Sequence, residues 1–267
     1  AIVITGSGRL FSAGADIREF GKPVQPPGLG DVAAAIENCD KPVVAAINGL
    51  ALGGGLELAM SCHYRVAAPT ALCGQPEVKL GIIPGAGGTQ RLPRLAGIEA
   101  ALDMIVGGTP VDAARALELG ILDKIFEEDF VAEAISFAAG VDGPRRTRDR
   151  DEKLAAARSN PGVFDAFRKS IERKARGYRA PYACIEAVEI ATQLGFDEGR
   201  ACEREIFAEC LQSDESKAMR HIFTAERRIA DVQGIKKSTP RRDVALAAVI
   251  GGGTMGVGIA MNFANAG

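Results

Sequence analysis

The chain has 267 residues, of which 47% are hydrophobic and 25% are charged, as in an ordinary globular protein. Its 32 basic and 34 acidic side chains nearly balance, so the net charge of -2 provides no field for binding nucleic acid or an anionic membrane. No apolar run approaches the ~20 residues of a membrane span, since the longest, residues 45–60, is interrupted by Asn48, Glu57 and four glycines. We therefore expect neither a nucleic-acid nor a membrane partner.

Cysteine and histidine are too sparse and too scattered to indicate a disulfide scaffold or a metal site. The six cysteines form no C-x-x-C pair, which favours reduced thiols in an intracellular protein. Only His63 and His221 could join a thiolate as metal ligands or serve as a base for a nucleophile. We expect no metal and no Ser-His or Cys-His catalytic pair.

The first half of the chain alternates predicted strands and helices, which is the rhythm of an α/β fold. Short β-branched or apolar runs predict strands at residues 1–5, 42–47, 64–68 and 71–74. A loop is predicted at 7–16, and three prolines make residues 22–30 irregular. Helices are predicted at 31–39, capped by Asp31, and at 56–62.

Beyond about Gly97 the pattern becomes predominantly helical. Helical spacing predicts helices or helix pairs at 112–120, capped by Asp112, and at 130–139, 149–158, 163–176, 181–194 and 198–231. A basic, turn-rich linker is predicted at 234–242, and an apolar strand at 244–250. Because the chain opens directly on a strand without Met and ends inside a new pattern, we expect it to be a piece of a longer protein.

Three motifs rich in glycine or other small residues carry the functional signal. The segment NGLALGGGLELA (48–59) places three glycines before a predicted helix, whose free N–H groups and positive dipole end can polarise a carbonyl oxygen. The loop FSAGAD (11–16) presents further amides after a strand, and GQPE (74–77) carries a carboxylate before IPGAGGT (83–89). Each motif alone also fits a plain packing turn, and Glu77 alone fits a solvated loop carboxylate.

Together, in this order and spacing, the motifs resemble the crotonase (enoyl-CoA hydratase/isomerase) superfamily over roughly the first 130 residues. The resemblance implies an α/β fold with a ββα spiral core, followed here by a helical region. It also implies an oxyanion hole formed by the backbone N–H groups of Ala15 and Gly54, with Glu57 and Glu77 as catalytic carboxylates. Further acyl-CoA-binding positions implied by the motifs are Ala13, Asp16, Ile17, Gly55, Pro84 and Gly85.

The two carboxylates favour enoyl-CoA hydratase activity, which needs no cofactor beyond the coenzyme A of the substrate. The resemblance makes Glu57 the expected base and Glu77 the expected acid, although the sequence itself does not separate these roles. Two alternatives remain open at this point. Glu77 could shuttle a proton between C4 and C2, giving Δ3-Δ2-enoyl-CoA isomerase activity, or the domain could bind acyl-CoA without catalysis.

The end of the chain adds a dinucleotide-binding pattern. Gly251, Gly253 and Gly256 form a G-x-G-x-x-G motif between the predicted strand and a predicted helix, which is the context of an NAD fingerprint. The order of segments resembles multifunctional β-oxidation enzymes, in which a hydratase half is fused to an NAD-dependent dehydrogenase. We expect NAD binding only in a longer chain, since the second strand and the acidic residue of the fingerprint are absent from these 267 residues.

These expectations define three segments. A crotonase-type core is predicted at 1–140, a helical region and linker at 141–242, and the start of a truncated Rossmann domain at 243–267. Besides the acyl-CoA substrate, the expected partners are a second copy of the chain or the fused dehydrogenase domain. The expected location is the cytoplasm, as for the bacterial members, with the peroxisome as the alternative.

Overall fold

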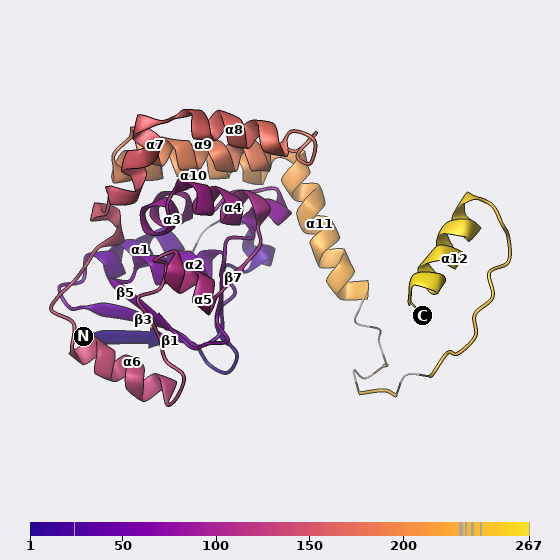
Figure 1. Cartoon of the computed structure of the whole chain (residues 1–267), viewed down its shortest axis with the longest axis horizontal. Coiled ribbons are helices and arrows are strands. Elements are labelled where there is room, and N and C mark those ends of the chain that lie inside the picture. Colours follow the sequence, from indigo (N-terminus) through magenta and orange to yellow (C-terminus); the bar gives the residue numbers. More distant parts are fainter. Residues whose placement is uncertain (24, 230–231, 233, 236–237, 241, 267) are drawn as a thin grey trace. The chain divides into compact units, whose positions relative to one another are not determined.

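The computed structural model describes residues 1–266 except 24, 230–231, 233, 236–237 and 241 (Figure 1). The chain forms two compact units, Ala1–Ala225 and Glu226–Gly267. All strands of the described residues belong to the first unit. No helix in the described part of the chain is long and apolar enough to cross a membrane.

Two four-stranded sheets organise the first unit. One has the order β1 (Ile2–Thr5), β3 (Val43–Ile47), β5 (Tyr64–Ala67) and β8 (Lys124–Ile125), all parallel. The other has the order β2 (Leu10–Ser12), β4 (Leu50–Leu52), β6 (Leu72–Gly74) and β7 (Val111–Asp112), with only the β6–β7 pair antiparallel. From β1 to β6 successive strands alternate between the sheets, which agrees with the predicted α/β spiral.

Strands β2, β4 and β7 of the second sheet and β8 of the first were not predicted, and β7 and β8 have only two residues each. β2 lies inside the segment 7–16 that we expected to be a loop, and β4 follows Asn48 directly. Both have three residues, too few to display the alternation by which a strand is recognised. Asn48 joins the turns that precede them, since its Oδ1 accepts from Gly6 N at 3.1 Å and its Nδ2 donates to Gly8 O at 2.9 Å.

Helices cover the sheets of this core. Their bounds are α1 (Leu29–Glu37), α2 (Gly54–Ser61), α3 (Gly88–Ala96), α4 (Ile98–Gly107), α5 (Ala113–Glu118) and α6 (Phe130–Ala139), with 3-10 turns η1 (Ile17–Glu19) and η2 (Glu77–Leu80). Asp112 caps α5 and α6 has the predicted bounds, but the predicted cap of α1 was wrong. That helix begins two residues before Asp31, whose carboxylate accepts from Gly28 N at 2.9 Å. The helix predicted at 56–62 also begins two residues early, at Gly54.

The helical region packs on this core rather than standing apart from it. Helices α9 (Ala180–Gln193) and α10 (Phe196–Gln212) pack against each other and against α3, and α9 also contacts α4 (Figure 1). The predicted 149–158 helix is instead broken into η3 (Thr147–Asp149), η4 (Glu152–Leu154) and α7 (Ala155–Ser159). The remaining members are α8 (Gly162–Ile171) and α11 (Asp214–Ile229).

The second unit contains α12 (Thr254–Ala266) but no strand at 244–250, so that strand prediction was wrong. A strand is stabilised by hydrogen bonds to a neighbouring strand, and the described residues of this unit provide none. The predicted glycine turn is present: a Cβ on Gly256 would lie 1.8 Å from Gly251 O. The ends of the predicted 198–231 helices and parts of the 234–242 linker lie outside the described residues.

Candidate active site

The N-terminus of α2 forms one wall of the candidate site. Gly53 is the N-cap, and Leu56 N and Glu57 N donate to its carbonyl at 2.8 and 3.0 Å. Gly54 is the first residue of the helix, so its N–H has no intrahelical acceptor and points outward with the positive end of the helix dipole. This is a backbone donor available to an anionic oxygen.

A second backbone donor lies beside it. Gly14 and Ala15 follow β2, and a Cβ placed on Gly54 would lie 3.5 Å from Ala15 N. Neither Ala15 N nor Gly54 N has a hydrogen-bond acceptor in the described part of the chain. Two neighbouring unpaired amides are the arrangement that stabilises developing negative charge on a thioester oxygen.

Glu57 projects from the first turn of α2 into the protein interior. Its side chain is 3% exposed, and Oε1 accepts from Ala86 N and Gly88 N, both at 2.7 Å. Burial, reinforced by the nearby Glu203 charge, raises the pKa of Glu57 to about 7, although the two amides oppose the shift. A carboxyl group with this pKa can accept or release a proton near neutrality.

Glu77 begins η2 and lies close to Glu57. Its pKa is raised well above the usual value, first by burial of the carboxyl group and then by the Glu57 charge. The buried Gln75 amide reaches both carboxylate oxygens, at 3.0 and 3.1 Å, when its nitrogen faces Glu77. In that orientation the Gln75 amide oxygen faces Gly88, and a Cβ on Gly88 would lie 3.0 Å from it and 3.0 Å from Glu57 Oε1, so the amide stands between the two acids.

The remaining sequence-predicted positions surround this centre in different ways. Asp16 is exposed and forms an ion pair with Arg18 at 2.6 Å, and hydrogen bonds from Arg18 lower its pKa to about 2. Gly55 is buried against β2, where a Cβ would lie 2.3 Å from Ser12 O. Gly85 lies under the Phe207 ring of α10, since a Cβ there would come within 2.7 Å of it.

Ala13 is exposed, Ile17 is half-buried and Pro84 is buried. Contact of these positions with acyl-CoA stays a prediction. The structure also brings in groups that the sequence analysis did not assign: the Gln75 amide, the N–H groups of Ala86 and Gly88, and Glu203. Gln75 was inside a recognised motif, whereas Glu203 lies beyond the first 130 residues that carry the resemblance, and its only signal is helical spacing that matches the apolar Phe196 and Ile206.

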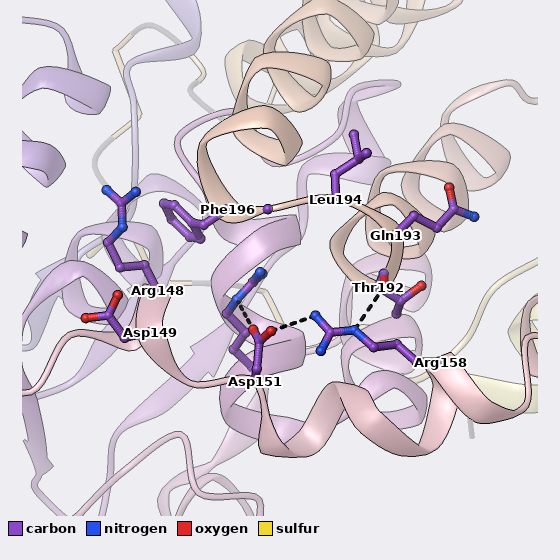
Figure 2. A pocket seen from close by; sticks show the side chains of 10 residues that line it. Arg148, Asp149, Asp151, Arg158, Thr192, Gln193, Leu194 and Phe196 are labelled. Carbon is purple, nitrogen blue, oxygen red and sulfur yellow. Dashed lines mark hydrogen bonds and ion pairs between the residues drawn. The ribbon is translucent and has the colours of Figure 1, made fainter.

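A separate cavity of about 490 Å³ lies between α3, η3 and the α9–α10 junction (Figure 2). It contains none of the predicted site residues. Arg158 donates to Asp151 at 2.6 Å and to Thr192 O at 3.1 Å, and Arg94 Nε lies 3.4 Å from the same aspartate. These charges are paired with one another, so the cavity does not compete with the Glu57 centre as a candidate active site.

The described residues contain no group of three or more His, Cys, Asp or Glu side chains that could hold a metal ion.

Comparison with known proteins agrees with this geometry. Residues 1–148 match the enoyl-CoA hydratase/isomerase family model. The peroxisomal bifunctional enzymes of Danio rerio and Homo sapiens are 44% and 45% identical over 273 residues, covering 100% of this chain and 38% of each relative. The chain thus spans little more than a third of those relatives. Carnitinyl-CoA hydratase from Mycobacterium avium has 30% identity and a TM-score of 0.58, covering 85% of this chain and 78% of that structure. The chain belongs to the enoyl-CoA hydratase/isomerase family.

Proposed function

We propose that this chain adds water to 2-enoyl-CoA thioesters to give 3-hydroxyacyl-CoA. The observation that carries the proposal is the juxtaposition of two acids with raised pKa, Glu57 and Glu77, in one centre. The unpaired amides of Ala15 and Gly54 support it, since hydration of an enoyl thioester develops negative charge on the thioester oxygen. One such donor typically contributes ~3 kcal/mol to transition-state stabilisation.

In the proposed reaction the two amides hold the thioester oxygen while a water molecule attacks C3. Glu57 takes a proton from that water, and the new C–O bond forms at C3. The C2–C3 double bond moves its electrons toward the thioester, and Glu77 delivers a proton to C2. Each such proton transfer typically contributes ~10²–10⁴-fold to the rate. Exchange with solvent water then restores the starting protonation of both acids.

The electrostatics support this division of roles. With a pKa of about 7, Glu57 is substantially ionised at neutral pH and can act as the base. The pKa of Glu77 is raised well above its usual value, which favours a protonated carboxyl that can act as the acid. Two crowded carboxyl groups resist ionising together, which keeps one of them protonated and available as an acid.

The test is hydration of crotonyl-CoA by the 267-residue chain and by its Glu57→Gln and Glu77→Gln variants. We expect each variant to lose at least 100-fold in kcat and to retain binding of the unreactive butyryl-CoA. Glu99→Gln, an exposed change on α4, is the matched control and should keep the parent rate. Activity within a few-fold of the parent in either site variant would exclude the assignment.

An assay with a 3-enoyl-CoA substrate distinguishes the isomerase alternative from hydratase activity. The isomerase would use the same acids to transfer a proton from C4 to C2. Rapid turnover of the 3-enoyl thioester with slow hydration would favour that activity. Binding of butyryl-CoA with no turnover of either substrate would indicate a catalytically silent acyl-CoA-binding domain. The two acids beside unpaired amides support the hydratase.

We further propose that the chain is the hydratase part of a longer bifunctional protein, with a core at 1–140, a helical region at 141–242 and the start of a nucleotide-binding domain at 243–267. Gly251, Gly253 and Gly256 would hold the pyrophosphate of NAD in that protein, and NAD would accept a hydride from the 3-hydroxyacyl product. The relatives are peroxisomal bifunctional enzymes, which favours a peroxisomal rather than a cytoplasmic location. Contacts with a second copy remain an alternative to contacts with the fused domain.

A further inference from the structure

Residues 86–89, called the 86–89 loop below, form the turn into α3 and its first two residues, and two buried carboxylates hold them from two sides. The N–H groups of Ala86 and Gly88 donate to Glu57 Oε1, both at 2.7 Å. The alternate N–H groups donate to Glu203 instead, Gly87 to Oε1 at 2.7 Å and Thr89 to Oε2 at 3.0 Å. Four consecutive amides therefore alternate between Glu57, the proposed catalytic base, and Glu203, a second buried carboxylate.

Glu203 comes from a distant part of the chain and has no contact with solvent. It lies on α10, 114 residues after Thr89, and is 0% exposed. Besides the two amides, it accepts from Thr89 Oγ1 at 2.5 Å and from Arg200 Nη1 at 2.8 Å. Burying a carboxylate is costly without such partners, and both oxygens of Glu203 are occupied by donors.

We propose that Glu203 is a positioning residue of the hydratase site: it fixes the 86–89 loop through the alternate amides, and thereby fixes the carboxylate of Glu57. The inference rests on the proposed hydratase function. It assigns to α10, which lies beyond the matched family region at 1–148, a direct role in arranging the catalytic centre.

The physical reason is the sensitivity of proton transfer to geometry. Both amides that hold Glu57 lie at the turn into α3, where three of residues 85–88 are glycines and have no side chain to fix the backbone. If Gly87 and Thr89 lose their acceptor, the loop can turn and carry Ala86 and Gly88 away from Glu57. A displacement of about 1 Å at a reacting group can cost ~10²-fold in rate. Substrate contacts at Ala15 and Gly54 remain unchanged, so the loss falls on kcat rather than on KM.

The charge of Glu203 also acts on Glu57. The charged groups around the pair are Glu77 on η2, Arg200 on α10 and Arg91 on α3, which donates to Ala86 O and is paired with Glu37 of α1. The Glu203 charge raises the pKa of Glu57, whereas Arg200 lowers it. Replacing Glu203 with a neutral amide removes the first effect and leaves the second. The acid limb of the pH–kcat profile, which requires an ionised Glu57, should therefore move to lower pH.

The principal test is Glu203→Gln in the 267-residue chain, assayed with crotonyl-CoA. The glutamine keeps the shape but presents an NH2 group to at least one loop donor. We expect kcat to fall 10- to 100-fold per active site, with KM within threefold and the acid limb shifted to lower pH. Active sites are counted by titration with butyryl-CoA. Glu205→Gln, the same change on the exposed side of α10, is the control and should match the parent.

Two results would overturn the inference. One is a kcat within twofold of the parent, and the other is an unchanged pH profile with a kcat reduced only in proportion to the folded fraction. If Glu203→Gln does not fold, Thr89→Val removes a single donor to Glu203 and leaves the amides in place. We then expect a twofold to tenfold loss of kcat, and parental kinetics would be contradictory. The parent's own activity reports separately on the hydratase function, so the two failures are distinguishable.

Discussion

Gly88 lies so close to the Glu57 carboxylate that there is no room for a side chain on this residue. Gly88 N donates to Glu57 Oε1 at 2.7 Å, and a Cβ on Gly88 would lie 3.0 Å from that same oxygen and 2.6 Å from Pro84 Cβ. The residue thus positions the proposed base with its backbone and makes room for it by having no side chain. Both properties are tested by one substitution.

We predict that Gly88→Ala lowers kcat for crotonyl-CoA at least tenfold and the free energy of unfolding by ~1–3 kcal/mol, as overpacking typically does. The added methyl group must push the Glu57 carboxylate or Pro84 away. Kinetics and urea unfolding measure the two effects. Gly107→Ala is the control, since a Cβ there meets nothing within 4 Å at the end of α4. Equal behaviour of the two variants would contradict the prediction.

Gly14 allows a test of the amide pair that leaves both acids untouched. It adopts φ +92°, and a Cβ there would lie 2.9 Å from Leu52 O and 3.1 Å from Gly54 N. We predict that Gly14→Ala displaces the Ala15 amide from Gly54 and lowers kcat at least tenfold. The measurement is crotonyl-CoA kinetics at the pH optimum, with the folded fraction checked by circular dichroism.

Gly8 provides the matched control for this backbone conformation. It also has a positive φ, +65°, but a Cβ there meets nothing within 4 Å. Gly8→Ala therefore introduces the strain of a left-handed alanine, ~1–2 kcal/mol, without crowding the amides. A loss of kcat in Gly8→Ala as large as in Gly14→Ala would show that strain, and not the displaced amide, is responsible.

The local elements of the site could be predicted because short-range features define them. The glycines at 53–55 and the helical pattern after them predicted a helix N-terminus close to that of α2. The order of the motifs then predicted that the Ala15 loop lies beside it. Glu77 illustrates the limit: alone it resembled a surface carboxylate, and only the fold brings it beside Glu57. Pairing across the sheets could not be predicted for β2 and β4, since three residues show no alternation.

The role of Glu203 depends on contacts that no local pattern contains. On α10 its helical spacing from Phe196, Ile206 and Cys210 places it on the buried face, unlike the exposed Glu205, but that spacing does not show which donors it meets there. It becomes distinctive only when α10 packs on α3 and meets the 86–89 loop. The strand prediction at 244–250 was wrong because it used local composition alone. This run has the composition of a strand, but the described residues of its unit provide no neighbouring strand for it to pair with.

The free energy of unfolding should depend on pH because the pKa of Glu57 differs between the folded and unfolded chain. Its pKa is about 7 in the folded chain against 4.5 in the unfolded chain, so the folded state binds this proton more tightly. The resulting stabilisation is complete below about pH 4.5 and is lost as pH rises toward 7, by up to ~3 kcal/mol. We predict that the free energy of unfolding of the parent, relative to Glu57→Gln, falls between pH 5 and 8. Urea titrations at both pH values measure it, and a constant difference would contradict the raised pKa.

The buried pair Glu37–Arg91 gives the largest predicted effect on stability. Arg91 Nη2 lies 2.9 Å from Glu37 Oε2 and Nε lies 3.2 Å from Oε1, with both side chains at most 2% exposed. Glu37→Gln leaves the Arg91 charge buried without its counter-ion, and breaking such a pair typically costs 3–5 kcal/mol. Arg91 also donates to Ala86 O at 3.0 Å, so the loss extends to the loop that holds Glu57.

We therefore predict that Glu37→Gln lowers the free energy of unfolding by ~3–5 kcal/mol in urea titrations. The control is Glu118→Gln, which breaks the exposed pair with Arg115, whose N···O distance is also 2.9 Å. Because exposed pairs are screened by water, that change should cost less than ~1 kcal/mol. Similar costs for the two variants would mean that burial does not set the strength of the Glu37–Arg91 pair. A large difference would identify this pair as a main link between α1 and the helix that follows the catalytic loop.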